Sequence, residues 1–170
     1  MKAEEAMPNE LDDVLADLGR AVQAYQAAVD DYDRETARLL GINGTDLRCL
    51  EHLIDAGELT PRELGERLNL VTGSVTAMLD RLEKLDLLAR APHPADRRKV
   101  VVRLTDAGRQ RCLDLIAPLI EDGAREIGSR YDASQLRLVT DYLRTNTELQ
   151  RRHVQRLRDQ ESPPATRRTR

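Results

Sequence analysis

The chain of 170 residues has no phenylalanine and no tryptophan, and its four tyrosines bring the aromatic content to only 2%. A core without large rings must be built from leucine, valine, isoleucine, alanine and methionine, which suits packed helices. A chain of this length can bury enough apolar surface to fold without a disulfide or a metal ion. The composition therefore predicts one mainly helical domain, or one domain with extensions.

Cysteine and long apolar runs are also scarce. The two cysteines, Cys49 and Cys112, lie far apart and in no C-x-x-C pair. We expect reduced, buried thiols on helices, with a redox switch as the alternative. No apolar stretch approaches the roughly 20 residues of a membrane span, and no signal-type segment opens the chain. The sequence therefore predicts a cytoplasmic protein without a membrane partner.

Catalytic and metal-binding patterns are missing as well. The three histidines are scattered, and no group of His, Cys, Asp and Glu has the spacing of metal ligands. The chain has no G-x-S-x-G, P-loop or dinucleotide fingerprint. We expect no enzyme activity, no metal ion and no cofactor.

Charge, in contrast, is abundant and unevenly spread. Charged residues make up 34% of the chain, and the net charge is -3. Residues 1–59 carry a charge of -9, whereas residues 60–105 carry nine Lys and Arg against six Asp and Glu, a charge of +3. A basic segment attracts phosphate whatever the balance of the whole chain, so the middle of the chain is the candidate for nucleic-acid binding.

Local signals divide the chain into helices. Apolar residues at helical spacing predict a long helix from Leu11 to about Leu40, ended by Gly41. A second helix follows the cap Asn43 and ends at Gly57. The capping box Thr60–Glu63, with Pro61 at the first position, opens a short helix that stops at Asn69. A further helix, capped by Thr72 or a neighbour, buries one apolar face. This face comprises Val75, Met78, Leu79, Leu82 and Leu85.

A change of period after Leu85 predicts a β-hairpin. Residues 87–91 and 99–104 have the character of strands, and Pro92–Asp96 that of a turn. Thr105–Asp106 then caps a long helix, which Pro118 should kink or break. A last helix begins near Ser134.

The short helix, tight turn and second helix form a candidate helix-turn-helix, and the basic hairpin directly after it strengthens that interpretation. Small side chains near the start of the second helix would let it enter a DNA major groove, where hydroxyls reach base edges and methyl groups meet thymine. Ordinary helix-start chemistry is the alternative explanation. The candidate residues are Thr72, Gly73, Ser74, Thr76 and Ala77.

Longer basic side chains extend this candidate DNA surface. Arg81 is long enough to reach the DNA backbone, although it could instead pair with charges around Asp80 and Glu83. At the hairpin tip, Arg97 or Arg98 would enter the neighbouring minor groove, whose negative potential favours guanidinium groups. A solvated hairpin tip is the alternative. Asp96 beside these arginines could orient the guanidinium as an ion pair.

These segments resemble the MarR-type regulators over residues 42–108. The most specific is the D-x-R pair of HPADRRKVVVRLTDAG, followed by a β-branched strand and L-T-x-x-G. By resemblance, Asp96 and Arg98 form the wing pair, Ser74 and Thr76 occupy recognition-helix positions, and Arg81 is a backbone contact. The chain departs from the family pattern in two places. Gly65 replaces the frequent alanine and Asp86 the usual glycine, but aspartate tolerates the left-handed conformation that the latter turn needs.

The resemblance implies a mainly α fold with a small β-hairpin wing, a winged helix-turn-helix joined to long N- and C-terminal dimerisation helices. Residues 42–105 would form the DNA-binding lobe, and residues 10–41 and 106–160 the dimerisation region. Residues 1–9 would be a flexible start and residues 161–170 a disordered tail. The implied partners are double-stranded DNA, a second copy of the chain and a small, anionic aromatic ligand.

The function expected is that of a homodimeric transcriptional repressor on a palindromic operator, released by such a ligand. The tyrosines Tyr25, Tyr32, Tyr131 and Tyr142 are its only candidate stacking surfaces. Two alternatives stay open, namely constitutive DNA binding without a ligand and a winged-helix module that binds another protein.

Overall fold

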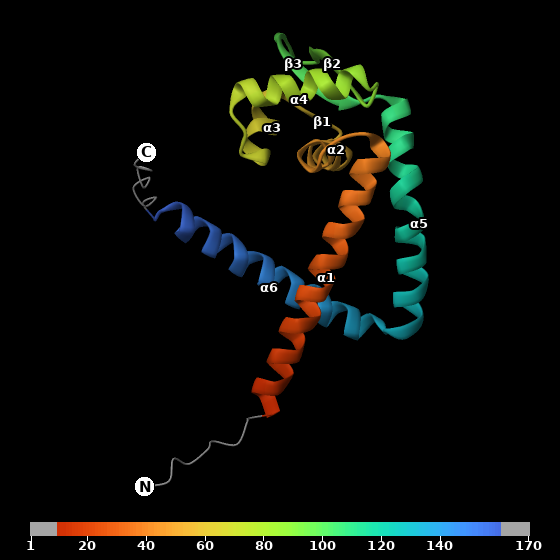
Figure 1. Ribbon diagram of the computed structural model, residues 1–170, viewed down its shortest axis with the longest axis vertical. Helices are drawn as coiled ribbons and strands as arrows, with labels where there is room; N and C mark the ends of the chain where they lie inside the picture. Colours follow the sequence, from red (N-terminus) through yellow and green to blue (C-terminus); the bar gives the residue numbers. More distant parts are fainter. Residues whose placement is uncertain (1–9, 161–170) are drawn as a thin grey trace, which may run out of the picture. The chain divides into compact units, whose positions relative to one another are not determined.

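The computed structural model describes residues 10–160, apart from the side chains of Arg97 and Arg98. The expected flexible start and disordered tail lie outside the described residues. Contacts divide the chain into two compact units, residues 1–117 and 118–170. The fold class is as predicted, mainly helical with a small sheet (Figure 1). The elements are α1 (Glu10–Leu40), α2 (Gly44–Ala56), β1 (Glu58–Leu59), α3 (Pro61–Leu68), α4 (Thr72–Lys84), β2 (Leu88–His93), β3 (Asp96–Leu104), α5 (Asp106–Arg130) and α6 (Ala133–Arg158).

The junction of α1 and α2 follows the local signals of the sequence. Gly41 takes a φ of 72° directly after the end of α1. The Asp46 backbone N–H donates to Asn43 Oδ1 at 3.0 Å, and the Asn43 N–H donates to Asp46 Oδ2 at 3.3 Å. This reciprocal pair is a complete capping box, which satisfies two backbone donors at the start of α2.

Helices α3 and α4 form the helix-turn-helix. The Glu63 N–H donates to Thr60 Oγ1 at 3.2 Å, and the Thr60 N–H donates to Glu63 Oε2 at 2.7 Å, so the predicted capping box is present. Asn69 ends α3 with a φ of 55°, a left-handed conformation that asparagine adopts more readily than most residues. Gly65 faces the turn so closely that an added Cβ would lie 3.2 Å from the Leu70 carbonyl oxygen. A small residue at this position therefore lets α3 pack against the turn.

The core of unit 1 is aliphatic, as the composition predicts. Its largest fully buried side chains come from α2, α3, α4, the strands and the start of α5. They are Leu50, Leu53, Leu64, Met78, Leu79, Leu82, Leu87, Leu88, Val102, Cys49, Cys112 and the one charged residue Asp46.

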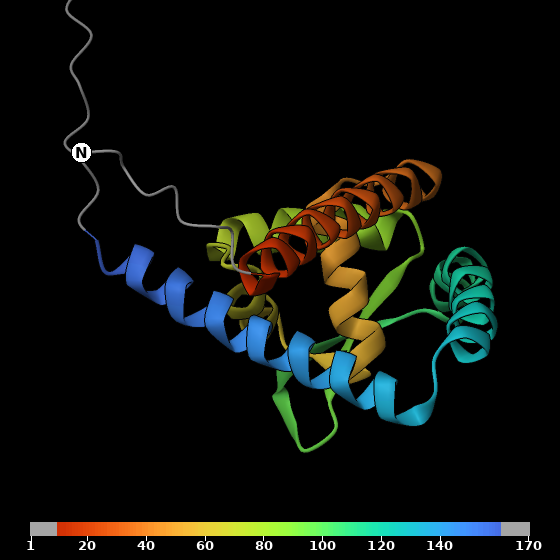
Figure 2. The same ribbon diagram turned by 90° about the horizontal axis from the view of Figure 1, so that it is seen from below.

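The sheet is larger than the predicted hairpin, with three antiparallel strands in the order β1-β3-β2. Strand β1, whose two residues pair with Arg103 and Val102, was not predicted. The predicted turn at residues 92–96 is too long, because β2 continues to His93 and β3 already starts at Asp96. Pro92 is tolerated since β2 is an edge strand, where a missing N–H does not interrupt the sheet. The hairpin projects beyond the neighbouring helices (Figure 2).

The segment L-T-x-x-G joins the sheet to α5. The Thr105 hydroxyl donates to the Asp86 carbonyl oxygen at 2.6 Å and accepts the Gly108 N–H at 2.8 Å. An added Cβ at Gly108 would lie only 2.1 Å from the Leu87 carbonyl oxygen. Thr105 therefore caps α5 and fixes the end of α4 at once, while Gly108 lets the two backbones approach.

Helix α5 runs through Pro118, and the boundary between the two units falls directly before this proline. On the unit 1 side, the Tyr32 hydroxyl of α1 donates to the Leu115 carbonyl oxygen at 2.5 Å. In unit 2, α6 begins at Ala133, one residue before the predicted start. Its cap is Asp132, which accepts the N–H groups of Ser134 and Gln135.

Candidate nucleic-acid interface

The first two turns of α4 present the small residues that the sequence nominates. Thr72, Gly73, Ser74, Thr76 and Ala77 are all exposed. The opposite face of the helix is buried through Val75, Met78, Leu79 and Leu82, as predicted, whereas Leu85 is 36% exposed. The apolar period of α4 thus holds the helix on the core and turns its small polar face to solvent.

The N-cap of α4 is Val71, the neighbour of Thr72, and in the part of the chain that the structure describes no side chain caps this helix. Thr72 is the first helical residue, and its carbonyl oxygen accepts the Thr76 hydroxyl at 3.1 Å. The start of α4 therefore lacks the side-chain hydrogen bond that a polar N-cap residue would add.

Arg81 has a partner that sequence reasoning missed. Its Nε donates to Asp46 Oδ2 at 2.9 Å and its Nη2 to Asp46 Oδ1 at 2.5 Å, a bidentate pair between α4 and the start of α2. The Asp46 side chain is fully buried, and that of Arg81 is 46% exposed. The hydrogen bonds to Asp46 raise the pKa of Arg81, so the guanidinium stays charged. Arg81 therefore positions α4 on α2 while part of its side chain still reaches the surface.

The alternative pairing of Arg81 with Asp80 or Glu83 is wrong, because these two carboxylates face Arg90 of β2. Arg90 Nη2 donates to Asp80 Oδ1 at 2.6 Å, and its Nη1 donates to Glu83. The Arg90 backbone N–H also donates to Glu83 at 3.4 Å. Two arginines thus hold α4 from opposite sides, one against α2 and one against the wing.

The wing is the β2–β3 hairpin, whose tip is Pro94–Ala95. The Ala95 N–H donates to His93 Nδ1 at 3.1 Å, which tightens the turn. Asp96 is the first residue of β3, and its Oδ2 lies 3.9 Å from Lys99 Nζ. The backbones of Arg97 and Arg98 belong to β3, but their side chains lie outside the described residues. The Asp96–Arg98 pair and the minor-groove contact therefore stay predictions.

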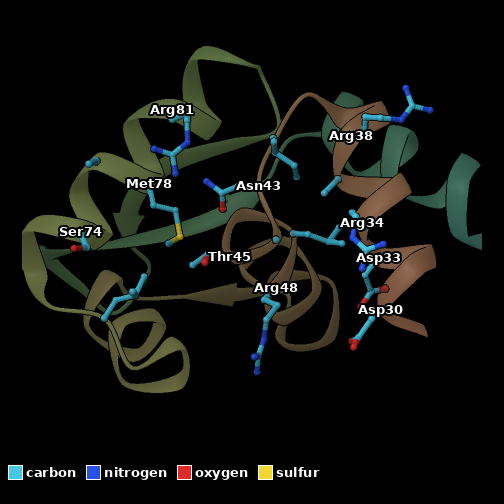
Figure 3. A pocket seen from close by; sticks show the side chains of 16 residues that line it. Asp30, Asp33, Arg34, Arg38, Asn43, Thr45, Arg48, Ser74, Met78 and Arg81 are labelled. Carbon is cyan, nitrogen blue, oxygen red and sulfur yellow. The ribbon is translucent and has the colours of Figure 1, made fainter. Parts of the chain in front are cut away.

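An open cleft of about 1100 Å³ lies between α1, α2 and α4 within unit 1 (Figure 3). Ser74, Met78 and Arg81 of α4 form one side, and side chains from the end of α1 form the other, with the start of α2 between them. Four arginines face it, namely Arg34, Arg38, Arg48 and Arg81. Three of them are paired with carboxylates, Arg34 with Asp31, Arg38 with Glu35 and Arg81 with Asp46. Asp30 and Asp33 also line the cleft, which thus combines charges of both signs with apolar side chains.

Comparison with known proteins agrees with this geometry. A sequence profile of the MarR family matches residues 40–99, from the end of α1 into the wing. The chain is 35% identical over 139 residues to YcgE, an HTH-type transcriptional regulator of Bacillus subtilis (strain 168), and the match covers 82% of this chain and 84% of YcgE. The chain belongs to the MarR family.

Two further relatives add detail to this assignment. The HTH-type transcriptional repressor MdtR of Bacillus subtilis (strain 168) is 30% identical, with 71% of this chain and 74% of MdtR covered. The crystal structure of an E. coli MarR variant complexed with operator DNA superimposes with a TM-score of 0.52 at 26% identity. That match covers 81% of this chain and 98% of the other. Members of the MarR family regulate transcription and are not enzymes, so this chain is a transcriptional regulator.

The two cysteines of this MarR-family chain are free and buried in the core, as expected. Burial and the nearby Asp46 carboxylate raise the pKa of the Cys49 thiol to about 12. Burial also raises the pKa of Cys112. Because thiolates are the reactive form, both groups are poorly suited to redox sensing in the folded state.

Among residues 10–160, no group of three or more His, Cys, Asp and Glu side chains could hold a metal ion. Within the same described part, no helix is long and apolar enough to cross a membrane.

Proposed function

We propose that this chain is a homodimeric repressor that binds a palindromic operator, with α4 in the major groove and the β2–β3 wing in the adjacent minor groove. The observation that carries the proposal is the exposed small-residue face of α4, held between Arg81–Asp46 and Arg90 beside a basic hairpin. A helix free of bulky side chains can approach base edges closely. The proposed contacts are Thr72, Gly73, Ser74, Thr76, Ala77, Arg81, Arg97 and Arg98, with Asp96 orienting the wing. Such a regulator would act in the cytoplasm, on the chromosome.

Apolar side chains left in solvent support the dimer. In unit 1, the first half of α1 exposes Leu11, Val14, Leu15 and Leu18, each by more than a third. In unit 2, α6 has no buried residue and exposes Leu138, Val139 and Leu143. Long stripes of this kind need a covering surface. We assign that role to a second copy of the chain, in line with the dimer that the family resemblance implies, and residues 10–41 and 106–160 would form this dimerisation region.

The cleft supports control by a small anionic ligand. Arg48, which has no partner among the described ion pairs, and the start of α2 offer charge and backbone donors for a carboxylate. Ile42, Leu70 and Met78 offer apolar contact. The tyrosines are all described residues, and none is among those that line the cleft, so an aromatic ligand would pack on aliphatic side chains. A ligand that favoured a dimer with differently separated recognition helices would release DNA by shifting populations.

A binding titration with fluorescent duplexes tests the proposal. Duplexes selected from a random library should contain half-sites whose centres are about 10 base pairs apart. The affinity should fall steeply with salt, because phosphate contacts release counterions. Arg98→Ala should weaken binding. Arg103→Ala, which removes an exposed arginine of the same strand that is not among the proposed contacts, is the matched control. Failure to select any duplex would favour the protein-binding alternative.

A further inference from the structure

The surface that α4 offers to DNA is almost free of available charge. Helix α4 contains four charged residues, and Asp80, Arg81 and Glu83 are all paired within unit 1. Only Lys84, the last residue of the helix, has no partner among the described ion pairs. The charged side chains of α4 thus fix its position, which leaves the reading of bases to its neutral residues.

The neutral side chains near the start of α4 carry three exposed hydroxyl groups, those of Thr72, Ser74 and Thr76. The Thr76 hydroxyl donates its proton to the Thr72 carbonyl oxygen. With this proton engaged, Thr76 offers a partner its methyl group and an oxygen that can only accept. Ala77 adds another exposed methyl group. Residues 71–77 contain no Arg, Lys, Asn or Gln, the side chains that read guanine and adenine through paired hydrogen bonds.

Val71 is the most informative residue of this surface. Its side chain is 74% exposed, although it is apolar, and it stands at the N-cap where Ser, Thr, Asp or Asn would add a hydrogen bond. The position therefore gives up a local stabilising contact and leaves an apolar group in water. Violations of local chemistry of this kind concentrate at functional surfaces.

We propose that α4 reads its half-site through thymine 5-methyl groups, with Val71 as the leading contact and Thr76 and Ala77 next to it, and without an arginine–guanine contact. The thymine methyl is the apolar group that the major groove displays, and it matches a surface of exposed methyl groups. The inference rests on the proposed DNA-binding function and adds the base class that the recognition helix selects.

Replacing thymine by uracil tests this, because the change removes only the 5-methyl group. The full chain is first used to select duplexes, and each thymine of the selected half-site is then replaced in turn. A buried methyl corresponds to about fourfold in affinity, so one to three positions should each lose about fourfold on replacement. Replacing guanine by 7-deazaguanine, which removes an acceptor that arginine uses, should change the affinity less than twofold at the positions that α4 covers.

Two variants tie the effect to Val71. Val71→Ser should bind the thymine duplex about fourfold to tenfold more weakly and should lose the uracil effect at one position. Its urea midpoint should stay equal or rise, because serine is a better cap, which separates lost contact from lost folding. Val71→Thr keeps one methyl group and should retain part of the uracil effect.

Two results would overturn this inference and leave the proposed function intact. In the first, the chain selects a duplex, but its affinity does not change when thymine is replaced by uracil. In the second, the affinity falls tenfold when a guanine at a position that α4 covers is replaced by 7-deazaguanine. If the chain selects no duplex at all, both the proposed function and this inference are wrong.

Discussion

Replacement of Asp46 by asparagine is the sharpest test of how the recognition helix is held. The carboxylate is fully buried and accepts three hydrogen bonds, two from Arg81 and one from the Asn43 backbone. Asp46→Asn keeps the size of the side chain but removes the charge and presents an NH₂ group to one Arg81 donor. We expect both folding and DNA binding to suffer, because the same contact joins α2 to the recognition helix.

The magnitude follows from the burial of the two partners. Breaking a fully buried ion pair costs about 3–5 kcal/mol, whereas an exposed pair is worth about 0–1 kcal/mol. In Asp46→Asn the charge left without its partner is Arg81, which is 46% exposed and can turn to water, so the cost falls below that of a fully buried pair. We therefore expect Asp46→Asn to lower the free energy of unfolding by about 2–3 kcal/mol. The matched control Asp80→Asn, whose side chain is 52% exposed, should cost less than about 1 kcal/mol.

Urea unfolding of both variants measures this difference, and a double-mutant cycle with Arg81→Met isolates the pair. The coupling energy should be about 1.5–2.5 kcal/mol, since each single variant strands the other partner. Two results would refute the view that this pair holds α4: a free energy of unfolding for Asp46→Asn within about 0.5 kcal/mol of that of the parent chain, or a double-mutant cycle with no coupling energy.

Three further predictions concern the surroundings of α4. Gly108→Ala should lower the free energy of unfolding by about 3 kcal/mol or more, because its Cβ would overlap the Leu87 backbone; an unchanged urea midpoint would contradict this. Cys49 and Cys112 should react with a thiol reagent at pH 8 only after unfolding, since both thiols are buried and burial raises their pKa values; rapid labelling of the native chain would argue against this. Asp86→Gly should raise the thermal midpoint by an amount equivalent to about 0.5–1 kcal/mol, because Asp86 has a φ of 55°; a lower midpoint would show that its side chain matters more than its backbone.

Features that depend on neighbouring residues could be predicted from the sequence. The caps at Asn43 and Thr60 use partners three residues apart, and the turn at Asn69 depends on its own backbone preference. The small-residue face of α4 follows in the same way from helical periodicity. The interactions that stabilise these features lie within a few residues along the chain, so they form in any fold that contains these helices.

Features that depend on distant partners could not be predicted. Strand β1 is only two residues long and exists because β3, more than forty residues later, supplies its hydrogen bonds. Arg81 offers no local sign of its pairing with Asp46, which lies 35 residues earlier. The sequence therefore predicts a DNA backbone contact for Arg81, with charges around Asp80 and Glu83 as the alternative partners. Arg90 of the adjacent strand β2, ten residues after Asp80, forms the ion pairs with Asp80 and Glu83.

This distribution of partners explains why the proposed reading surface of α4 carries so little charge. A short helix with one buried face has few positions left, and its arginine and carboxylates already serve to orient it against α2 and β2. A charge that orients the helix is not free to read a base, because a buried or bridged carboxylate would be stranded if its arginine left. The positions that remain for recognition are those at the start of the helix, where small residues and Val71 stand. In the proposed complex, Arg81 therefore holds the helix and contacts the DNA backbone alone, whereas Val71, which is not among the contacts predicted from the sequence, would meet a base.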